Sequence, residues 1–237
     1  MAAPYLARFD NAAVDPLWSE LTMELQPGEF LAVLGPNGVG KSTLLGTILG
    51  TRHLTAGTVT VPARVGYIPQ QRMFPQDLPM RARDLVSLSV AHGTIRSRRA
   101  TAARVTELLT EVSATGIADR RVGLLSGGQQ QLIRQAQALA GDPQLLLADE
   151  PLLSLDPARQ AATVDKLDTW RRERNMSIIF VTHGINPILD VVDRVLYLAP
   201  HGHILGTVGE VMRSEVLSEL YGSKVNVINV DGRLIVV

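Results

Sequence analysis

The hydrophobic and polar positions of this chain follow two different patterns in turn. Continuous apolar runs at 30–34, 144–148 and 177–181 are typical of strands that are buried on both faces of a sheet. The segments 129–140 and 158–174, the second of them rich in charged residues, are predicted to be helices. Strands that alternate with helices indicate an α/β fold with a mostly parallel sheet, whose ligand-binding loops lie at the carboxyl ends of the strands.

Three regions depart from this alternation. From about residue 72 to 124, apolar residues recur at helical spacing, as in Val105-Leu108-Leu109-Val112, and predict an inserted helical lobe. Short β-type runs at 58–61 and 64–68 are bounded by Gly and Pro. At the end of the chain, Asp231-Gly232 lies between two β-rich runs and predicts a terminal hairpin.

The clearest chemical motif is a stretch that matches G-x-x-x-x-G-K-[ST], namely Gly35-Pro36-Asn37-Gly38-Val39-Gly40-Lys41-Ser42-Thr43. It follows the apolar run 30–34 and precedes the helix-like run 44–49, so strand, loop and helix come in the order that a phosphate-binding loop requires. Glycines let backbone N–H groups approach phosphates in conformations that a β-carbon obstructs. The start of the helix adds its positive end. We expect Lys41 to reach the β- and γ-phosphates of a nucleoside triphosphate, and the Ser42 hydroxyl to bind Mg²⁺.

Two adjacent carboxylates, Asp149 and Glu150, end the apolar run 144–148. Side chains alternate across a strand, so this pair can serve one site only where the strand ends and the chain turns. We expect Asp149 to hold the Mg²⁺ shell. Glu150 is then placed to orient and deprotonate the water that attacks the γ-phosphorus.

A second candidate anion site stands directly before the helix 129–140, and its residues are Ser126, Gly127, Gly128 and Gln129. Serine and two glycines at a helix start form an N-cap with exposed N–H groups. One chain has little use for two such helix starts on the same phosphate. A second subunit would explain both: at each bound phosphate, one chain would supply the phosphate loop and the other chain the helix start at 126–129.

Composition narrows the classes of function. The 237 residues are 46% hydrophobic, and 23 Lys and Arg balance 23 Asp and Glu, which argues against a general nucleic-acid-binding surface. The chain has no cysteine, which excludes disulfides, thiolate metal sites and a Cys nucleophile. No segment approaches the ~20 apolar residues needed to span a bilayer. We therefore expect a soluble chain whose membrane role, if it has one, runs through a partner.

Taken together, Gly35 to Thr43, Gln70, Leu125 to Gln129, Asp149-Glu150 and His183 resemble the ATP-binding subunit of an ABC transporter. The resemblance covers nearly the whole chain. It implies a P-loop NTPase cassette with a mostly parallel core sheet, an antiparallel β region and an inserted helical lobe. The expected division of this single domain, 1–237, is a RecA-like core at about 1–71 and 125–215, a lobe at about 72–124, and a C-terminal extension with a hairpin at about 216–237.

The resemblance also implies roles for single residues. Gln70 would contact Mg²⁺ and sense the membrane partner, Glu150 would be the general base, and His183 would contact the γ-phosphate. Residues Ser154-Leu155-Asp156 resemble the loop that links two such sites. The family's sandwich dimer would close Ser126 onto the ATP held by the partner subunit's phosphate loop. For stacking on adenine the candidate is Phe9, with Tyr5 as a second candidate.

Several kinds of ABC protein fit these residues. An importer ATPase would lie on the cytoplasmic face of the membrane, paired with a separate permease and, indirectly, an extracytoplasmic substrate-binding protein. One alternative is a soluble ABC ATPase that acts on DNA or ribosomes. Another is a regulatory cassette that does not hydrolyse ATP, and the presence of Glu150 and His183 argues against this one. Segments 74–78 and 216–222 look like those of bacterial zinc/manganese importer ATPases. Iron–siderophore and cobalamin importers are the alternative, and no nucleic-acid partner is expected.

Overall fold

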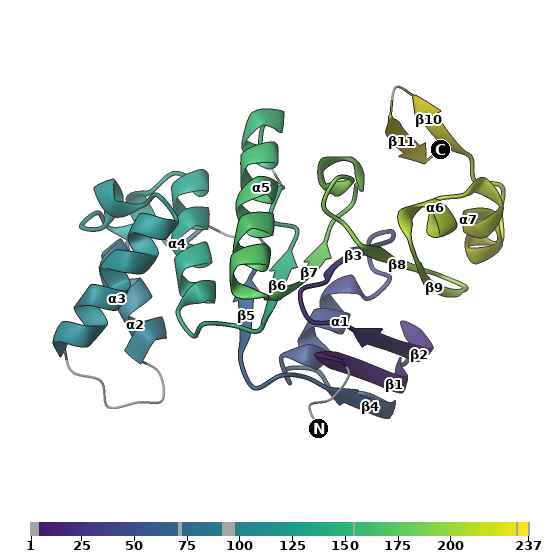
Figure 1. Cartoon of the computed structure of the whole chain (residues 1–237), viewed down its shortest axis with the longest axis horizontal. Coiled ribbons are helices and arrows are strands. Elements are labelled where there is room, and N and C mark those ends of the chain that lie inside the picture. The colour runs from purple at the N-terminus through teal and green to yellow at the C-terminus, as the bar shows by residue number, and fades with distance from the viewer. Residues whose placement is uncertain (1–4, 71–72, 92–97, 154, 231, 237) are drawn as a thin grey trace.

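The structure is a computed structural model of the chain (Figure 1), which describes residues 5–70, 73–91, 98–153, 155–230 and 232–236. For residues 91 and 98–100 only the backbone is described. The predicted turn residue Asp231 and the predicted loop residue Ser154 lie outside the described residues.

A mostly parallel sheet forms the centre of the molecule, with strand order β5-β6-β7-β3-β8-β9. Its parallel strands are β3 (Phe30–Leu34), β5 (Val65–Ile68), β6 (Leu145–Asp149), β7 (Ser177–Val181) and β8 (Arg194–Ala199). The last strand, β9 (Gly202–Gly206), pairs antiparallel with β8. Every residue of β3, β6 and β7 is buried, which explains their continuous apolar runs. The predicted α/β class is confirmed.

One face of this sheet packs against a smaller antiparallel sheet of order β2-β1-β4. Its strands are β1 (Ala7–Val14), β2 (Trp18–Leu25) and β4 (Ala56–Thr60), and the first helix, α1 (Lys41–Ile48), lies in the same apolar cluster. Figure 1 shows this antiparallel region beside α1, on the side of the molecule away from the helical lobe. The expected antiparallel β region is therefore present.

Helices cover the other face of the central sheet, and most of them gather at one end of the molecule (Figure 1). The lobe contains α2 (Ala82–Ala91), α3 (Arg98–Glu111) and the 3₁₀ turns at Thr115–Ile117 and Val122–Leu124. Helix α4 (Gly127–Leu139) packs on α2 and α3, and α5 (Pro157–Arg174) follows β6. The exact division of the chain into core, lobe and extension stays a prediction.

The C-terminal end carries two short helices and a hairpin. A 3₁₀ turn (Asn186–Ile188) follows β7, and α6 (Val208–Val211) and α7 (Ser214–Tyr221) follow β9. Strands β10 (Val227–Val230) and β11 (Arg233–Val236) then pair antiparallel, which confirms the predicted terminal hairpin. It projects at the opposite end of the molecule from the lobe (Figure 1).

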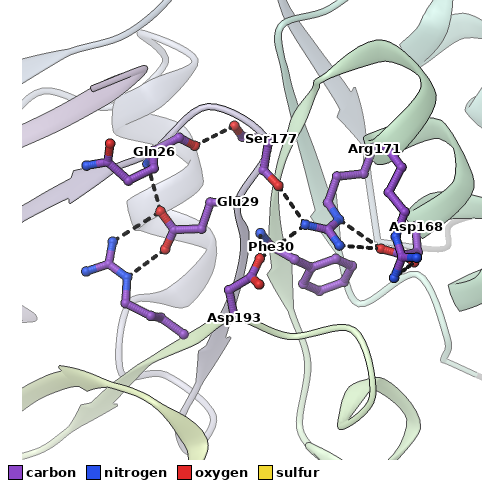
Figure 2. A network of polar contacts seen from close by, with 10 residues as sticks. Gln26, Glu29, Phe30, Asp168, Arg171, Ser177 and Asp193 are labelled. Atoms are coloured by element: carbon purple, nitrogen blue, oxygen red, sulfur yellow. Dashed lines mark hydrogen bonds and ion pairs between the residues drawn. The ribbon is translucent and has the colours of Figure 1, made fainter. Parts of the chain in front are cut away.

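A polar network ties together the amino ends of β3, β7 and β8 (Figure 2). Glu29 accepts from Arg194, with Nε at 2.7 Å and Nη2 at 3.2 Å, and from the backbone N–H of Gln26 at 2.7 Å. Arg171 donates to Asp168 at 2.8 Å and to Asp193 at 3.2 Å. These contacts hold together the amino ends of three strands that are distant in the sequence. The candidate site lies at the opposite edge of the sheet, at the carboxyl ends of the strands.

Candidate nucleotide site

The phosphate loop runs from the end of β3 into α1, and its glycines are required by the backbone itself. Gly35 has φ 139°, and a Cβ there would lie 2.1 Å from the carbonyl oxygen of Leu198. Gly40 has φ 101° and caps α1, and a Cβ there would lie 2.8 Å from the Trp18 ring. Both positions therefore exclude any side chain, for reasons of conformation and of space.

Lys41 occupies the centre of this loop and is only 6% exposed. Its ammonium donates to the carbonyl oxygens of Gly35 at 2.6 Å and Pro36 at 2.9 Å. Burial lowers the pKa of Lys41, and the charges of Glu150 and Asp149 act against that shift. The loop thus holds a buried cation beside two carboxylates, next to a helix start that no side chain caps. This arrangement suits a phosphate group with a bound cation.

Asp149 ends β6 and is 4% exposed. Its Oδ1 accepts from the Ser42 hydroxyl and its Oδ2 from the Tyr67 hydroxyl, each at 3.4 Å. Burial raises the pKa of the Asp149 carboxyl, with the nearby charge of Glu150 adding to the shift. Ser42 and Asp149 offer the hydroxyl and carboxylate oxygens that Mg²⁺ prefers, so the donor set fits that ion.

Glu150 is held between two polar side chains from neighbouring strands. Its Oε2 accepts from Gln70 Nε2 at 2.8 Å, and its Oε1 lies 2.5 Å from His183 Nε2. Gln70 follows β5 and His183 follows β7, the two neighbours of β6 in the sheet. Glu150 itself has φ 49°, a conformation that costs a residue with a side chain about 1 kcal/mol or more and that gathers at functional sites. The turn expected after Asp149 is thus present, and it aims the carboxylate at its two partners.

The segment Ser126–Gln129 lies apart from the phosphate loop. Ser126 caps α4, accepting from the Gln129 N–H at 3.4 Å, while its own N–H donates to Gln129 Oε1 at 3.1 Å. Over the ranges that the structure describes, no hydrogen bond or ion pair joins 126–129 to 35–43. In Figure 1, α4 lies on one side of α5 and α1 on the other. The expected helix start is present, at a distance from this chain's own phosphate loop.

The structure contradicts the assignment of Phe9 to adenine stacking. Phe9 is fully buried in β1, in the apolar cluster beneath the antiparallel sheet, so neither ring face is open to a base. Its position follows from the burial pattern of β1, in which residues 7 and 9 point inward. Tyr5, the second candidate, is half-buried, with the Arg8 guanidinium 5.7 Å from its ring centroid.

Other residues of the candidate site and its surroundings make local contacts. Asp156 caps α5 by accepting from the Arg159 N–H at 2.9 Å, so in this chain it makes a helix-capping contact. His203 lies half-buried in β9, where burial lowers its pKa. Within the described part of the chain, no group of three or more His, Asp and Glu residues is arranged to hold a metal ion. Sequence reasoning missed Tyr67, whose contact with Asp149 depends on the pairing of β5 with β6.

Fold and site together define a P-loop nucleotide-binding domain: a parallel sheet, a phosphate loop, and two adjacent carboxylates, Asp149 and Glu150, at the end of β6. The family model for ABC transporters matches residues 18–153. The zinc import ATP-binding protein ZnuC of Paracoccus denitrificans is 35% identical, over 88% of this chain and 80% of that protein. The molybdate import ATP-binding protein MolC of Haemophilus influenzae is 33% identical, over 86% and 81%. A solved metal-chelate type ABC transporter in an inward-facing conformation shares 27% identity and a TM-score of 0.83, over 98% of this chain and 95% of its own.

The chain belongs to the ABC transporter family, as an ATP-binding cassette with the ATPase site of that family. The expected resemblance and fold are confirmed.

Proposed function

We propose that this cassette hydrolyses Mg²⁺-bound ATP and energises the import of a metal ion, zinc or manganese, through a separate membrane permease. The observation that carries the hydrolytic part is the position of Glu150, which Gln70 and His183 hold at the end of β6 beside Asp149 and Lys41. A carboxylate fixed in this way suits a general base. Cargo is proposed from the relatives, several of which are named zinc import ATP-binding proteins.

The chain's own residues divide the chemistry among them. The loop 35–43 would bind the phosphates through backbone N–H groups, and Lys41 would neutralise charge on the β- and γ-phosphates. Ser42 and Asp149 would hold Mg²⁺, with Gln70 beside them; the ion would balance charge that develops between the two phosphates. Glu150 would orient the attacking water and accept its proton. His183, in contact with Glu150, would contact the γ-phosphate.

A second cassette completes the site. Ser126 is exposed at the start of α4, and its helix start lies apart from this chain's phosphate loop. In a head-to-tail pair of copies, the segment 126–129 of one chain would meet the ATP held by the other. ATP would then act as part of the contact between the two cassettes. Closing and reopening of this pair is the two-state change that would drive a membrane partner.

The permease would bind at a groove between the core and the lobe. A cavity of about 540 Å³ runs along the edge strand β5, between it and helices α2 and α4, and is lined by Tyr67, Pro69 and Arg134 among others. Pro69 directly precedes Gln70, so the groove leads to the catalytic carboxylates. Exposed apolar side chains of the same lobe, Met73 and Leu88, would supply contact area. Among the described residues, no helix is long and apolar enough to cross a bilayer.

The assembly would lie on the cytoplasmic face, where ATP is available, and would work with an extracytoplasmic substrate-binding protein. Two of the similar proteins favour an alternative cargo. One is the solved metal-chelate type transporter and the other is the molybdate relative, so the metal could be carried as a chelate or as an oxyanion. The cassette does not touch cargo in this scheme. Its permease and binding protein would therefore decide between zinc, manganese and a metal chelate.

The enzymatic part is tested by replacing Glu150 with Gln, which keeps the shape of the side chain and removes its basicity. The expected result is a fall in kcat of about 100- to 10,000-fold with ATP binding retained, and an ATP-dependent dimer in light scattering. Glu215→Gln, at an exposed position on α7, is the matched control and should hydrolyse ATP at the normal rate. Normal turnover in Glu150→Gln would show that the base lies elsewhere.

The transport part is tested by purifying the tagged chain from detergent-solubilised native membranes and identifying its partners by mass spectrometry. A permease with many membrane spans is the expected partner, and the metal bound by its companion binding protein would identify the cargo. Recovery with ribosomal or DNA-associated proteins alone would assign the chain to the non-transport ABC ATPases.

A further inference from the structure

Tyr67 lies at a point where the sheet register brings an edge strand to the metal-ligand carboxylate. In the parallel pairing of β5 and β6, Tyr67 is the partner of Leu147. Asp149 lies two residues further along β6, on the same face and diagonal to Tyr67, within reach of a long side chain. The Tyr67 hydroxyl uses this reach and donates to Asp149 Oδ2 at 3.4 Å.

The two oxygens of Asp149 therefore have different partners. Oδ1 accepts from Ser42, at the start of α1, and Oδ2 accepts from Tyr67, on the outermost strand of the sheet. A carboxylate held at both oxygens has a fixed plane. If Tyr67 lost its hydroxyl, the hydrogen bond at Oδ2 would be gone and the carboxylate could turn about its own bond. A buried carboxylate, 4% exposed, has little water to replace that contact.

Tyr67 also connects Asp149 with the groove between core and lobe. It lines the cavity of about 540 Å³ together with Arg134, from helix α4. The guanidinium carbon of Arg134 lies 4.3 Å from the ring centroid of Phe74. Arg134 thus lies against Phe74 and shares the cavity with Tyr67, whose hydroxyl contacts Asp149.

We propose that Tyr67 is a positioning residue that holds the Asp149 carboxylate in the plane needed for Mg²⁺, and that Arg134 acts on the metal site through it. This inference deepens the proposed function and rests on it, since it takes Asp149 as a ligand of nucleotide-bound Mg²⁺. It makes the outer strand β5 part of the metal site. It also connects helix α4, through Tyr67, with a metal ligand.

The test measures how Mg²⁺ strengthens ATP binding in the non-hydrolysing Glu150→Gln chain. Tyr67→Phe in this background keeps the ring and removes only the hydroxyl. The affinity for ATP is titrated at a series of Mg²⁺ concentrations and again in EDTA. The Mg²⁺ half-effect is the Mg²⁺ concentration that gives half of the full gain in ATP affinity. We expect it to rise about tenfold, the size of one lost hydrogen bond to a charged group. Affinity in EDTA should stay unchanged, because the phosphate loop is untouched.

The matched control is Tyr197→Phe, which also removes a bonded hydroxyl, 3.0 Å from that of Tyr221, in the same sheet. It should leave both affinities unchanged. An unchanged Mg²⁺ half-effect in Tyr67→Phe would overturn the inference, and so would an equal loss in EDTA, which would indicate general damage to the loop. If the Glu150→Gln parent itself showed no Mg²⁺ dependence, the proposed function would fail first.

The contribution of Arg134 is measured with a double-mutant cycle. Arg134→Met should raise the Mg²⁺ half-effect in the same direction as Tyr67→Phe. If Arg134 acts through Tyr67, the double variant should be no worse than Tyr67→Phe alone. Additive effects of the two substitutions would overturn the link between α4 and the metal site. Thermal unfolding of each variant shows that the chain measured is folded.

Discussion

Replacing Glu29 with Gln is a direct test of what holds the parallel strands in register. Glu29 is 7% exposed and precedes β3. Its carboxylate accepts two hydrogen bonds from Arg194, at 2.7 and 3.2 Å, and one from the backbone of Gln26, at 2.7 Å. Glutamine has nearly the same shape, but it offers one acceptor oxygen and places an NH₂ group where a donor already points. The substitution therefore removes charge and leaves a part-buried donor of Arg194 without a partner.

The magnitude follows from burial on each side of the pair. Breaking a fully buried ion pair costs about 3–5 kcal/mol. The Arg194 side chain is 31% exposed, so water recovers part of that loss. We expect Glu29→Gln to lower the free energy of unfolding by about 2–3 kcal/mol. For a chain of this size that corresponds to a fall in Tm of roughly 4–12 °C.

Urea unfolding followed by tryptophan fluorescence suits this measurement, because Trp18 and Trp170 are both buried. The control is Glu24→Gln, which weakens an exposed pair with Arg8 at 3.5 Å and should change stability by less than about 1 kcal/mol. ATP affinity of the folded Glu29→Gln chain should stay normal, since the network lies at the opposite edge of the sheet from the site. Equal losses in the two variants would refute the reasoning that burial gives the Glu29 contacts their strength.

Three further predictions concern the nucleotide site. Ser126→Arg should leave ATP binding by the single chain intact and prevent the ATP-dependent dimer, as measured by light scattering; a monomer that no longer binds ATP would contradict this. Gly35→Ala should abolish detectable ATP binding in a filter assay, because its Cβ would meet a backbone oxygen of β8 at 2.1 Å, whereas Gly116→Ala, with no atom within 4 Å, should bind normally. Asp149→Asn should stabilise the nucleotide-free chain at neutral pH: burial raises the pKa of this carboxyl in the folded state, so its ionisation opposes folding above that pKa. The gain, followed by urea unfolding, should shrink as the pH falls through the raised pKa, and a gain that grows on acidification would show the sign to be wrong.

The sequence predicts those parts of the fold that local pattern determines. The apolar runs of β3, β6 and β7 are buried on both faces and could be assigned without any knowledge of their neighbours. The phosphate loop is equally local, because strand, glycines and helix start are contiguous. The adenine candidate Phe9 failed for the opposite reason. Whether an aromatic ring on β1 faces a ligand or the core depends on which face of the strand packs inward, and here residues 7 and 9 do.

Contacts between strands could not be predicted because they depend on register. Glu150 meets Gln70 and His183 only because β6 lies between β5 and β7, an order that the sequence does not contain. The antiparallel strand β9 was also missed, since its five residues include two glycines and none is fully buried, which leaves no clear apolar signal. The sequence was thus enough to identify the candidate site residues, but not to predict which of them contact one another.

The edge strand β5 occupies a particular place in this site, because β5 and the residues directly after it contact both carboxylates. Tyr67 reaches Asp149, and Gln70, three residues later, reaches Glu150. A displacement of β5 would therefore move the proposed metal ligand and the proposed base together, while the phosphate loop, held by β3 at the centre of the sheet, stayed in place. The groove proposed for the permease runs along this same strand. A partner bound there would act on hydrolysis through β5 without having to disturb the binding of the phosphates, which is the separation that coupling ATP hydrolysis to a membrane partner requires.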